Sequence, residues 1–132
     1  MRTGLSIGDL GKATGTKAET IRFYEKVGIL PEPARTSGNY RSYSEEHVRR
    51  LTFVRKARNL GFRLETVRAL LDFADQPDRP CVEVDKLVIE QLHEVERKLA
   101  DLERLRKELA RMIQQCHGGP VSDCRIIEAL SP

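Results

Sequence analysis

Apolar positions in the first part of the chain repeat with helical spacing and are bounded by residues that cap helices. Ser6, followed three residues later by Asp9, is a typical helix start, and Gly15 supplies a typical helix end. Thr16 and Glu19 repeat the start signal at the opening of "KAETIRFYEKVG". Two short helices joined by a glycine-containing turn predict a helix-turn-helix, whose second helix enters the DNA major groove.

The helical periodicity then breaks at "LPEPARTSGNYRSYS". Prolines interrupt helices, Ser-Gly-Asn favours a turn, and "NYRSY" alternates like a strand. Residues 35–43 are therefore predicted to form a small hairpin, or wing. Its arginines and tyrosines could donate hydrogen bonds to phosphate oxygens; the alternative is a surface turn whose aromatic rings pack on the core. The candidate side chains are Arg35, Tyr40, Arg41 and Tyr43.

Two more helices are predicted in "EEHVRRLTFVRKARNLGF", capped by Ser44, and in "LETVRALLDFA". Apolar residues at core spacing predict one buried face on each helix. These residues are Val48, Leu51, Phe53, Val54 and Leu60 in the first, and Leu64, Val67, Leu70, Leu71 and Phe73 in the second. The prolines of "DQPDRPC" interrupt the helical pattern, so we expect a globular domain over residues 1–75 and a hinge over 76–81.

A long helix is predicted from residue 82 to about 115, where the chain contains neither glycine nor proline. Its apolar residues alternate four and three apart, interrupted only by Arg106: Val88, Leu92, Val95, Leu99, Leu102, Leu109 and Ile113. Such a narrow stripe is typical of a coiled-coil seam. A helix of about 33 residues is roughly 50 Å long and cannot bury this stripe alone, which favours a twofold homodimer.

Charge and hydropathy narrow the class of protein. No run approaches the roughly 18 apolar residues of a membrane span, and the N-terminus has no signal-peptide pattern, so we expect a cytoplasmic protein that does not associate with membranes. Residues 1–75 hold 14 Lys and Arg against 9 Asp and Glu, whereas residues 76–132 hold 9 against 11. This asymmetry favours an anionic partner, such as nucleic acid, for the first part only.

The chain contains three cysteines, which stay free in a reducing cytoplasm unless they bind metal or act in redox chemistry. Cys81 and Cys116 lie at opposite ends of the predicted long helix, so they cannot share an ion within one chain. If two such helices pair antiparallel, Cys81 of one copy meets Cys116 and Cys124 of the other. Three thiolates suit Zn(II), Cd(II), Hg(II), Pb(II) or Cu(I), with His117 as a further candidate ligand. The alternative is that the cysteines are inert.

Catalysis has little support in the sequence. No Ser/His/Asp or Cys/His grouping, phosphate-binding glycine loop or pair of acids with a pocket is apparent, so the chain is not expected to be an enzyme.

Two segments, "TIRFYEKVGIL" and "NYRSYSEEHVRRLTFVRKARNLGF", together resemble the DNA-binding domain of the MerR family of transcriptional regulators. The resemblance continues through the hinge, the long helix and the cysteine loop. It implies an all-α fold with a small β wing, in which a winged helix-turn-helix precedes a long antiparallel coiled-coil helix. The implied parts are a DNA-binding domain (1–75), a hinge (76–81), a dimerisation helix (82–115), and a metal-binding loop with a short C-terminal helix (116–132).

The resemblance also implies partners and contact residues. Its implied partners are double-stranded operator DNA, a second copy of the chain, and RNA polymerase at a promoter that the metal-bound dimer bends and untwists. The implied DNA contacts are Lys17, Thr20, Arg22 and Tyr24 on the recognition helix, together with the four wing residues. Many family members have a non-acidic residue where this chain has Glu19.

The family pattern further implies which ion is sensed. In the copper and silver branch the position of Cys81 is typically Ser, so Cys here favours Zn(II), Cd(II), Pb(II) or Hg(II). Three thiolates around a divalent ion leave a net charge of −1, and around a monovalent ion −2, which is harder to bury. The seven residues between Cys116 and Cys124 instead resemble copper sensors. We expect a sensor of a divalent ion that activates a metal efflux or detoxification promoter. The first alternative is a Cu(I)/Ag(I) sensor of the same family, and the second, less favoured alternative is a cytosolic metal buffer that does not bind DNA.

Overall fold

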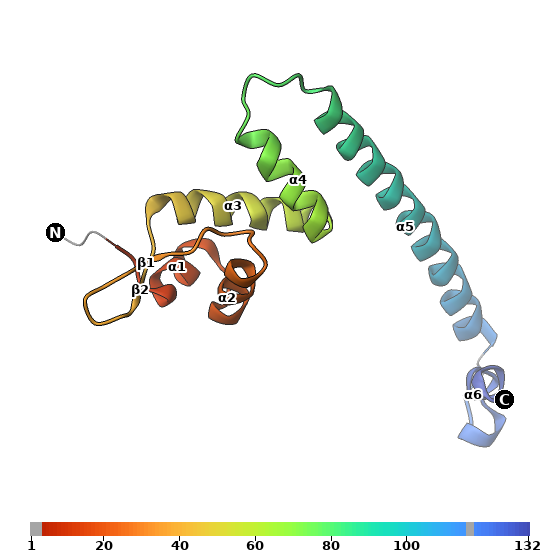
Figure 1. The fold of residues 1–132 in the computed structure, drawn as a ribbon. Helices are drawn as coiled ribbons and strands as arrows, with labels where there is room; N and C mark the ends of the chain where they lie inside the picture. Colours follow the sequence, from red (N-terminus) through yellow and green to blue (C-terminus); the bar gives the residue numbers. More distant parts are fainter. Residues whose placement is uncertain (1–3, 116–117) are drawn as a thin grey trace. The chain divides into compact units, whose positions relative to one another are not determined.

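The computed structural model describes residues 4–115 and 118–132. Its elements in chain order are α1 (Ile7–Thr14), α2 (Ala18–Lys26), β1 (Ala34–Arg35), β2 (Arg41–Ser42), α3 (Glu45–Asn59), α4 (Leu64–Ala74), α5 (Val82–Gln115), the 3-10 turn η1 (Val121–Asp123) and α6 (Arg125–Leu130). The fold is mostly helical, with a small two-stranded wing and a long helix (Figure 1), which confirms the predicted fold class. The chain divides into two compact units, Met1–Leu87 and Val88–Pro132.

Helix α1 begins and ends where the capping residues predicted. The Asp9 N–H donates to Ser6 Oγ at 3.1 Å, and the Ser6 N–H donates to Asp9 Oδ2 at 3.3 Å, which together form a capping box. Gly15 ends the helix in the left-handed region, with φ of 65°.

The second predicted cap, Thr16 with Glu19, is wrong. Helix α2 begins at Ala18, and its N-cap residue Lys17 makes no side-chain capping bond. The Thr16 hydroxyl instead accepts a hydrogen bond from the Thr14 hydroxyl at 3.1 Å, so it faces back toward α1. The prediction failed because the turn between α1 and α2 is one residue longer than the capping pattern required.

The predicted wing is present as a short antiparallel hairpin. Ala34 pairs with Ser42, and Arg35 lies directly opposite Arg41. The turn between them has Asn39 at φ of 66°, a conformation that Asn tolerates better than most residues. At the base of the wing, Tyr43 exchanges two backbone hydrogen bonds of 2.8 Å with Leu5.

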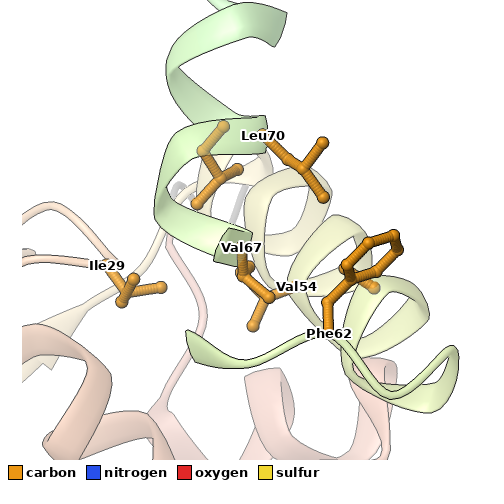
Figure 2. Packing of buried hydrophobic residues seen from close by; sticks show 7 residues of the cluster. Ile29, Val54, Phe62, Val67 and Leu70 are labelled. Carbon is orange, nitrogen blue, oxygen red and sulfur yellow. The ribbon is translucent and has the colours of Figure 1, made fainter. Parts of the chain in front are cut away.

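Two apolar clusters form the core of the first unit. One joins α3 and α4 and contains Ile29, Val54, Ala57, Phe62, Val67, Leu70 and Leu71; Figure 2 shows its side chains meeting between the two helices. The other contains Leu10, Ile21, Leu30, Tyr43 and Leu51. Tyr24 packs against both clusters, so the second helix of the helix-turn-helix rests on the whole core.

Among the apolar residues predicted to be buried in the third and fourth helices, Leu60 is exposed. Leu60 is 65% exposed because α3 ends at Asn59, and the turn through Gly61, at φ of 88°, directs the chain away from the helical face. Phe62, two residues later, is buried in its place. His47, which is buried at the start of α3, also completes that helix's capping box by accepting the Ser44 N–H at Nδ1, at 3.1 Å.

Helix α5 is one continuous helix of 34 residues, and it contains no buried residue. Every member of the predicted seam is exposed in the single chain, from 38% at Val95 to 69% at Ile113. No helix in the described part of the chain is both long and apolar enough to cross a membrane.

Candidate nucleic-acid interface and metal centre

The second helix of the helix-turn-helix, α2, and its N-cap residue Lys17 carry candidate contact residues that differ in exposure. Ile21 is fully buried and anchors the helix. Lys17 and Arg22 are exposed, and Thr20 and Tyr24 are half-buried at the edges of the outer face.

Phe23 also lies on the outer face of α2 and is 48% exposed beside Tyr24, with ring centroids 6.1 Å apart. An exposed aromatic side chain next to two basic residues could stack on or pack against a nucleic-acid partner. The sequence pattern assigns Phe23, with Ile21 and Tyr24, to the apolar side of this helix, and that assignment is wrong for Phe23.

The wing brings two guanidinium groups together. Arg35 and Arg41 are directly paired across the ladder, so both side chains lie on the same face of the hairpin. Like charges in this arrangement repel, and an anion such as a phosphate relieves the repulsion. The Arg35 guanidinium donates to the Asn39 carbonyl at 3.2 Å, and Arg41 Nε lies 3.3 Å from Glu25 Oε2.

The two wing tyrosines differ in exposure. Tyr40, in the turn, is 75% exposed, whereas Tyr43 is 1% exposed, and its hydroxyl donates to Glu25 Oε1 at 2.6 Å. Burial, reinforced by the hydrogen bond to the Glu25 carboxylate, raises the pKa of Tyr43 well above its ordinary value. Packing on the core, the alternative considered for the wing aromatics, therefore holds for Tyr43. The prediction that Tyr43 contacts DNA directly is therefore wrong, because its side chain is buried.

An open groove of about 540 Å³ lies beside the start of α2, lined among others by Lys17, Thr20, Arg55 and Arg58. The guanidinium of Arg55 donates to the Gly15 carbonyl, and that of Arg58 donates to the Phe62 carbonyl at 3.0 Å. These two arginines extend the basic surface from α2 onto α3. Their spacing of three on a helix predicts a shared basic face, but the sequence alone does not show that this face continues from α2.

Several arginines of the first unit bind backbone carbonyls. Arg50 Nε donates to the Ile29 carbonyl at 2.7 Å, and the Arg68 guanidinium donates to the Val27 carbonyl. Both acceptors lie just after α2, where carbonyl groups lack helical partners. Part of the positive charge of residues 1–75 therefore holds the recognition helix in place.

Two of the three candidate metal ligands lie in the described residues, each at a helix start. Cys81 is exposed and directly precedes α5: its carbonyl accepts the Asp85 N–H at 2.9 Å, and its Sγ lies 3.7 Å from Asp85 Oδ1. Cys124 is partly exposed and is the N-cap residue of α6. Cys116 and His117 lie outside the described residues.

Within residues 4–115 and 118–132, no group of three or more His, Cys, Asp or Glu side chains converges as a metal site. The donor chemistry nevertheless fits a soft ion, because cysteine sulfur is a soft ligand and solvent can reach both Cys81, which is exposed, and Cys124, which is partly exposed.

Comparison with known proteins settles the family. Residues 5–74 match the model of the MerR HTH family regulatory protein, and residues 48–112 match that described as MerR, DNA binding. The chain belongs to the MerR family. The resemblance stated from "TIRFYEKVGIL" and the wing motif is therefore confirmed.

Individual relatives are similar over nearly their whole length. The HTH-type transcriptional regulator CueR of Salmonella typhi is 37% identical over 127 residues, covering 96% of this chain and 92% of that protein. The mercuric resistance operon regulatory protein of Bacillus cereus is 36% identical over 125 residues, covering 94% and 95%. The transcription regulator PbrR691 from Ralstonia metallidurans CH34, solved in complex with lead(II), superposes with a TM-score of 0.80 at 38% identity, covering 96% and 99%.

These matches assign the chain to the metal-responsive, DNA-binding transcription regulators of the MerR family, which are not enzymes.

Proposed function

We propose that this MerR-family regulator senses a divalent soft metal ion, Zn(II), Cd(II), Pb(II) or Hg(II), through three thiolates. Cys81 comes from one protomer of a homodimer, and Cys116 and Cys124 come from the other. Metal binding distorts operator DNA so that RNA polymerase transcribes a metal efflux or detoxification promoter.

The observation that carries the proposal is the position of the cysteines relative to α5. Cys81 directly precedes the first residue of this helix, and Cys116 directly follows its last. A continuous helix of 34 residues is about 51 Å long at 1.5 Å per residue. Antiparallel pairing of two such helices would bring each Cys81 to the end of the partner helix that precedes Cys116 and Cys124.

The exposed seam of α5 supports the dimer. Its leucines at positions 92, 99, 102 and 109 are 55–61% exposed, and a second copy of the same helix would cover them. Burial of apolar area contributes roughly 25 cal/mol per Å², so a seam of this length provides a substantial driving force for association.

Charge favours a divalent ion, because three thiolates leave less net negative charge around it than around a monovalent ion. The similarity to a regulator solved with lead(II) agrees with this choice. A Cu(I) or Ag(I) sensor is the second candidate, favoured by the 37% identity to CueR and by the seven-residue spacing between Cys116 and Cys124.

In this proposal the DNA-contact set consists of the N-cap residue Lys17, of Thr20, Arg22 and Tyr24 on α2, and of Arg35, Tyr40 and Arg41 on the wing. The exposed cations supply phosphate contacts, which position the protein on the duplex.

A metal titration of the reduced protein tests the ligand set. Thiolate-to-metal absorption is followed with Cd(II), Pb(II), Hg(II), Zn(II) and Cu(I) for the wild type, for Cys81→Ser, and for Val82→Ser as the matched control. Val82 is the exposed neighbour of Cys81, so its variant alters the same helix start and keeps all three sulfurs.

The expected result is about one divalent ion per protomer in the wild type and in Val82→Ser, with divalent binding lost in Cys81→Ser. Unchanged divalent affinity in Cys81→Ser would rule out the three-thiolate site. Tight Cu(I) binding that does not depend on Cys81 would instead support the second candidate.

A further inference from the structure

Glu25 lies in the last turn of α2, and the proposed function does not use it. We propose that Glu25 is the positioning residue that fixes the wing, and with it the Arg41 guanidinium, relative to the recognition helix for DNA binding. The inference rests on DNA binding by the chain and is independent of which metal is sensed.

Both carboxylate oxygens of Glu25 contact the wing. Oε1 accepts the Tyr43 hydroxyl at 2.6 Å, and Oε2 lies 3.3 Å from Arg41 Nε. The Glu25 side chain is only 9% exposed, and a carboxylate buried to that extent is stable only when its charge is compensated. Glu25 therefore joins two elements that the chain connects only through an irregular segment.

The contact leaves Arg41 able to bind a partner. Among the described residues, Arg41 Nε has no acceptor in hydrogen-bonding geometry, so its attraction to Glu25 is electrostatic. Nε is enclosed, yet 34% of the Arg41 side chain is exposed. A guanidinium has five N–H donors, and those beyond Nε can donate to a phosphate. Glu25 therefore orients Arg41 without occupying all of its donors.

The other Glu25 partner is a rigid part of the wing. The Tyr43 ring meets His47 edge to face, with centroids 5.2 Å apart, and His47 Nε2 lies 3.0 Å from the Pro31 carbonyl oxygen. The Tyr43 backbone is paired with Leu5. Because these contacts hold Tyr43 without Glu25, a change at Glu25 is expected to alter the orientation of Arg41 more than the packing of Tyr43.

If Glu25 acted only through its negative charge, its removal would have the opposite effect on DNA affinity from the one that a positioning role predicts. Removing a carboxylate close to the DNA surface reduces repulsion from phosphates and raises affinity for any duplex. A positioning role lowers affinity for the cognate duplex, because the orientation of Arg41 is lost while its charge is kept. The sign of the change therefore separates the two roles.

The test uses Glu25→Gln, which keeps an acceptor for the Tyr43 hydroxyl and removes the charge that holds Arg41. Glu65→Gln, at an exposed position of α4, is the matched control with the same change in net charge. Two duplexes serve as probes: one that the wild-type dimer selects from a random library, and a scrambled duplex of the same composition. Fluorescence anisotropy gives both affinities at one fixed salt concentration.

We expect Glu25→Gln to weaken binding to the selected duplex about tenfold, the effect of losing one charged contact, with little change or a gain on the scrambled duplex. Glu65→Gln should change either affinity by less than about twofold. In an Arg41→Ala background, Glu25→Gln should cause no further loss, because the residue that it positions is gone.

The inference would be overturned if Glu25→Gln bound the selected duplex as tightly as the wild type. It would also be overturned if Glu25→Gln weakened binding as much in the Arg41→Ala background as in the wild type. If Glu25→Gln does not fold, Arg41→Lys provides the test: it keeps the charge without the planar fork, and wild-type affinity in that variant would refute the positioning role. If the wild-type protein selects no duplex, DNA binding by the chain is contradicted, and not only the role of Glu25. The metal titration described above does not depend on the outcome of these DNA-binding experiments.

Discussion

The hydrogen bond between Tyr43 and Glu25 makes a quantitative prediction about stability. Tyr43 is 1% exposed, and its hydroxyl lies 2.6 Å from Glu25 Oε1. A hydrogen bond to a charged group contributes about 1.5–3 kcal/mol, so Tyr43→Phe is expected to lower the free energy of unfolding by about 2 kcal/mol near neutral pH. The phenylalanine ring keeps the packing and removes only the donor.

The advantage of the wild type over Tyr43→Phe should shrink at alkaline pH. The pKa of Tyr43 is raised in the folded state, whereas an unfolded tyrosine titrates near its ordinary value of about 10. The stabilisation is fully present below the unfolded pKa and is lost as pH rises toward the folded pKa, because the unfolded chain releases its proton first. By about pH 11 the loss is about 1.4 kcal/mol, which narrows the gap from about 2 to about 0.6 kcal/mol.

Urea unfolding, followed by the helical circular dichroism signal at about pH 8 and about pH 11, measures this gap. Protein concentration and reductant are held fixed, because dimerisation is coupled to unfolding. Tyr40→Phe, at the 75% exposed wing position, is the control and should change stability by less than about 0.5 kcal/mol at both pH values. A gap between the wild type and Tyr43→Phe that stays constant between the two pH values would refute the reasoning.

Three further changes test other parts of the molecule. Val67→Ala, at a fully buried site between α3 and α4, should lower the free energy of unfolding by about 2 kcal/mol in urea denaturation, and a neutral result would contradict the assigned packing. Leu99→Asp, at a 61% exposed position of the α5 seam, should shift sedimentation toward the monomer, and an unchanged dimer would place the interface elsewhere. Arg79→Gln removes a guanidinium that stacks 4.4 Å from the Phe73 ring centroid and lies 2.8 Å from Glu83, so hydrogen exchange of the hinge amides should accelerate; unchanged exchange would show that this contact does not hold the hinge.

Local signals in the sequence were sufficient for most of the helices. The Ser6–Asp9 capping box forms as predicted, and α5 runs from Val82 to Gln115, the segment without glycine or proline. Such features depend only on residues within one or two turns of each other. The same reasoning failed at Leu60, because helical periodicity does not reveal that α3 has already ended at Asn59.

The candidate site was less predictable because burial on the wing depends on contacts between distant segments. Tyr40 and Tyr43 are three residues apart and chemically equivalent, yet only Tyr43 pairs with Leu5 and reaches Glu25. No local pattern distinguishes them. Glu25 itself was overlooked, since a glutamate near a helix end usually lies on a solvated surface.

Positive charge in the first unit has two separate uses, which net charge alone does not distinguish. Arg50, Arg55 and Arg68 donate to backbone carbonyls around the helix-turn-helix, and they fix the frame that carries α2. Arg22 and Arg35 are exposed on the recognition helix and the wing, where phosphates can reach them. The salt dependence of DNA binding counts only the charges that phosphates neutralise, so its slope should follow the cations that contact phosphates rather than the total of 14 Lys and Arg in residues 1–75. Arg50, Arg55 and Arg68 contribute to DNA binding indirectly, because their carbonyl acceptors flank α2 and these hydrogen bonds hold that helix in place.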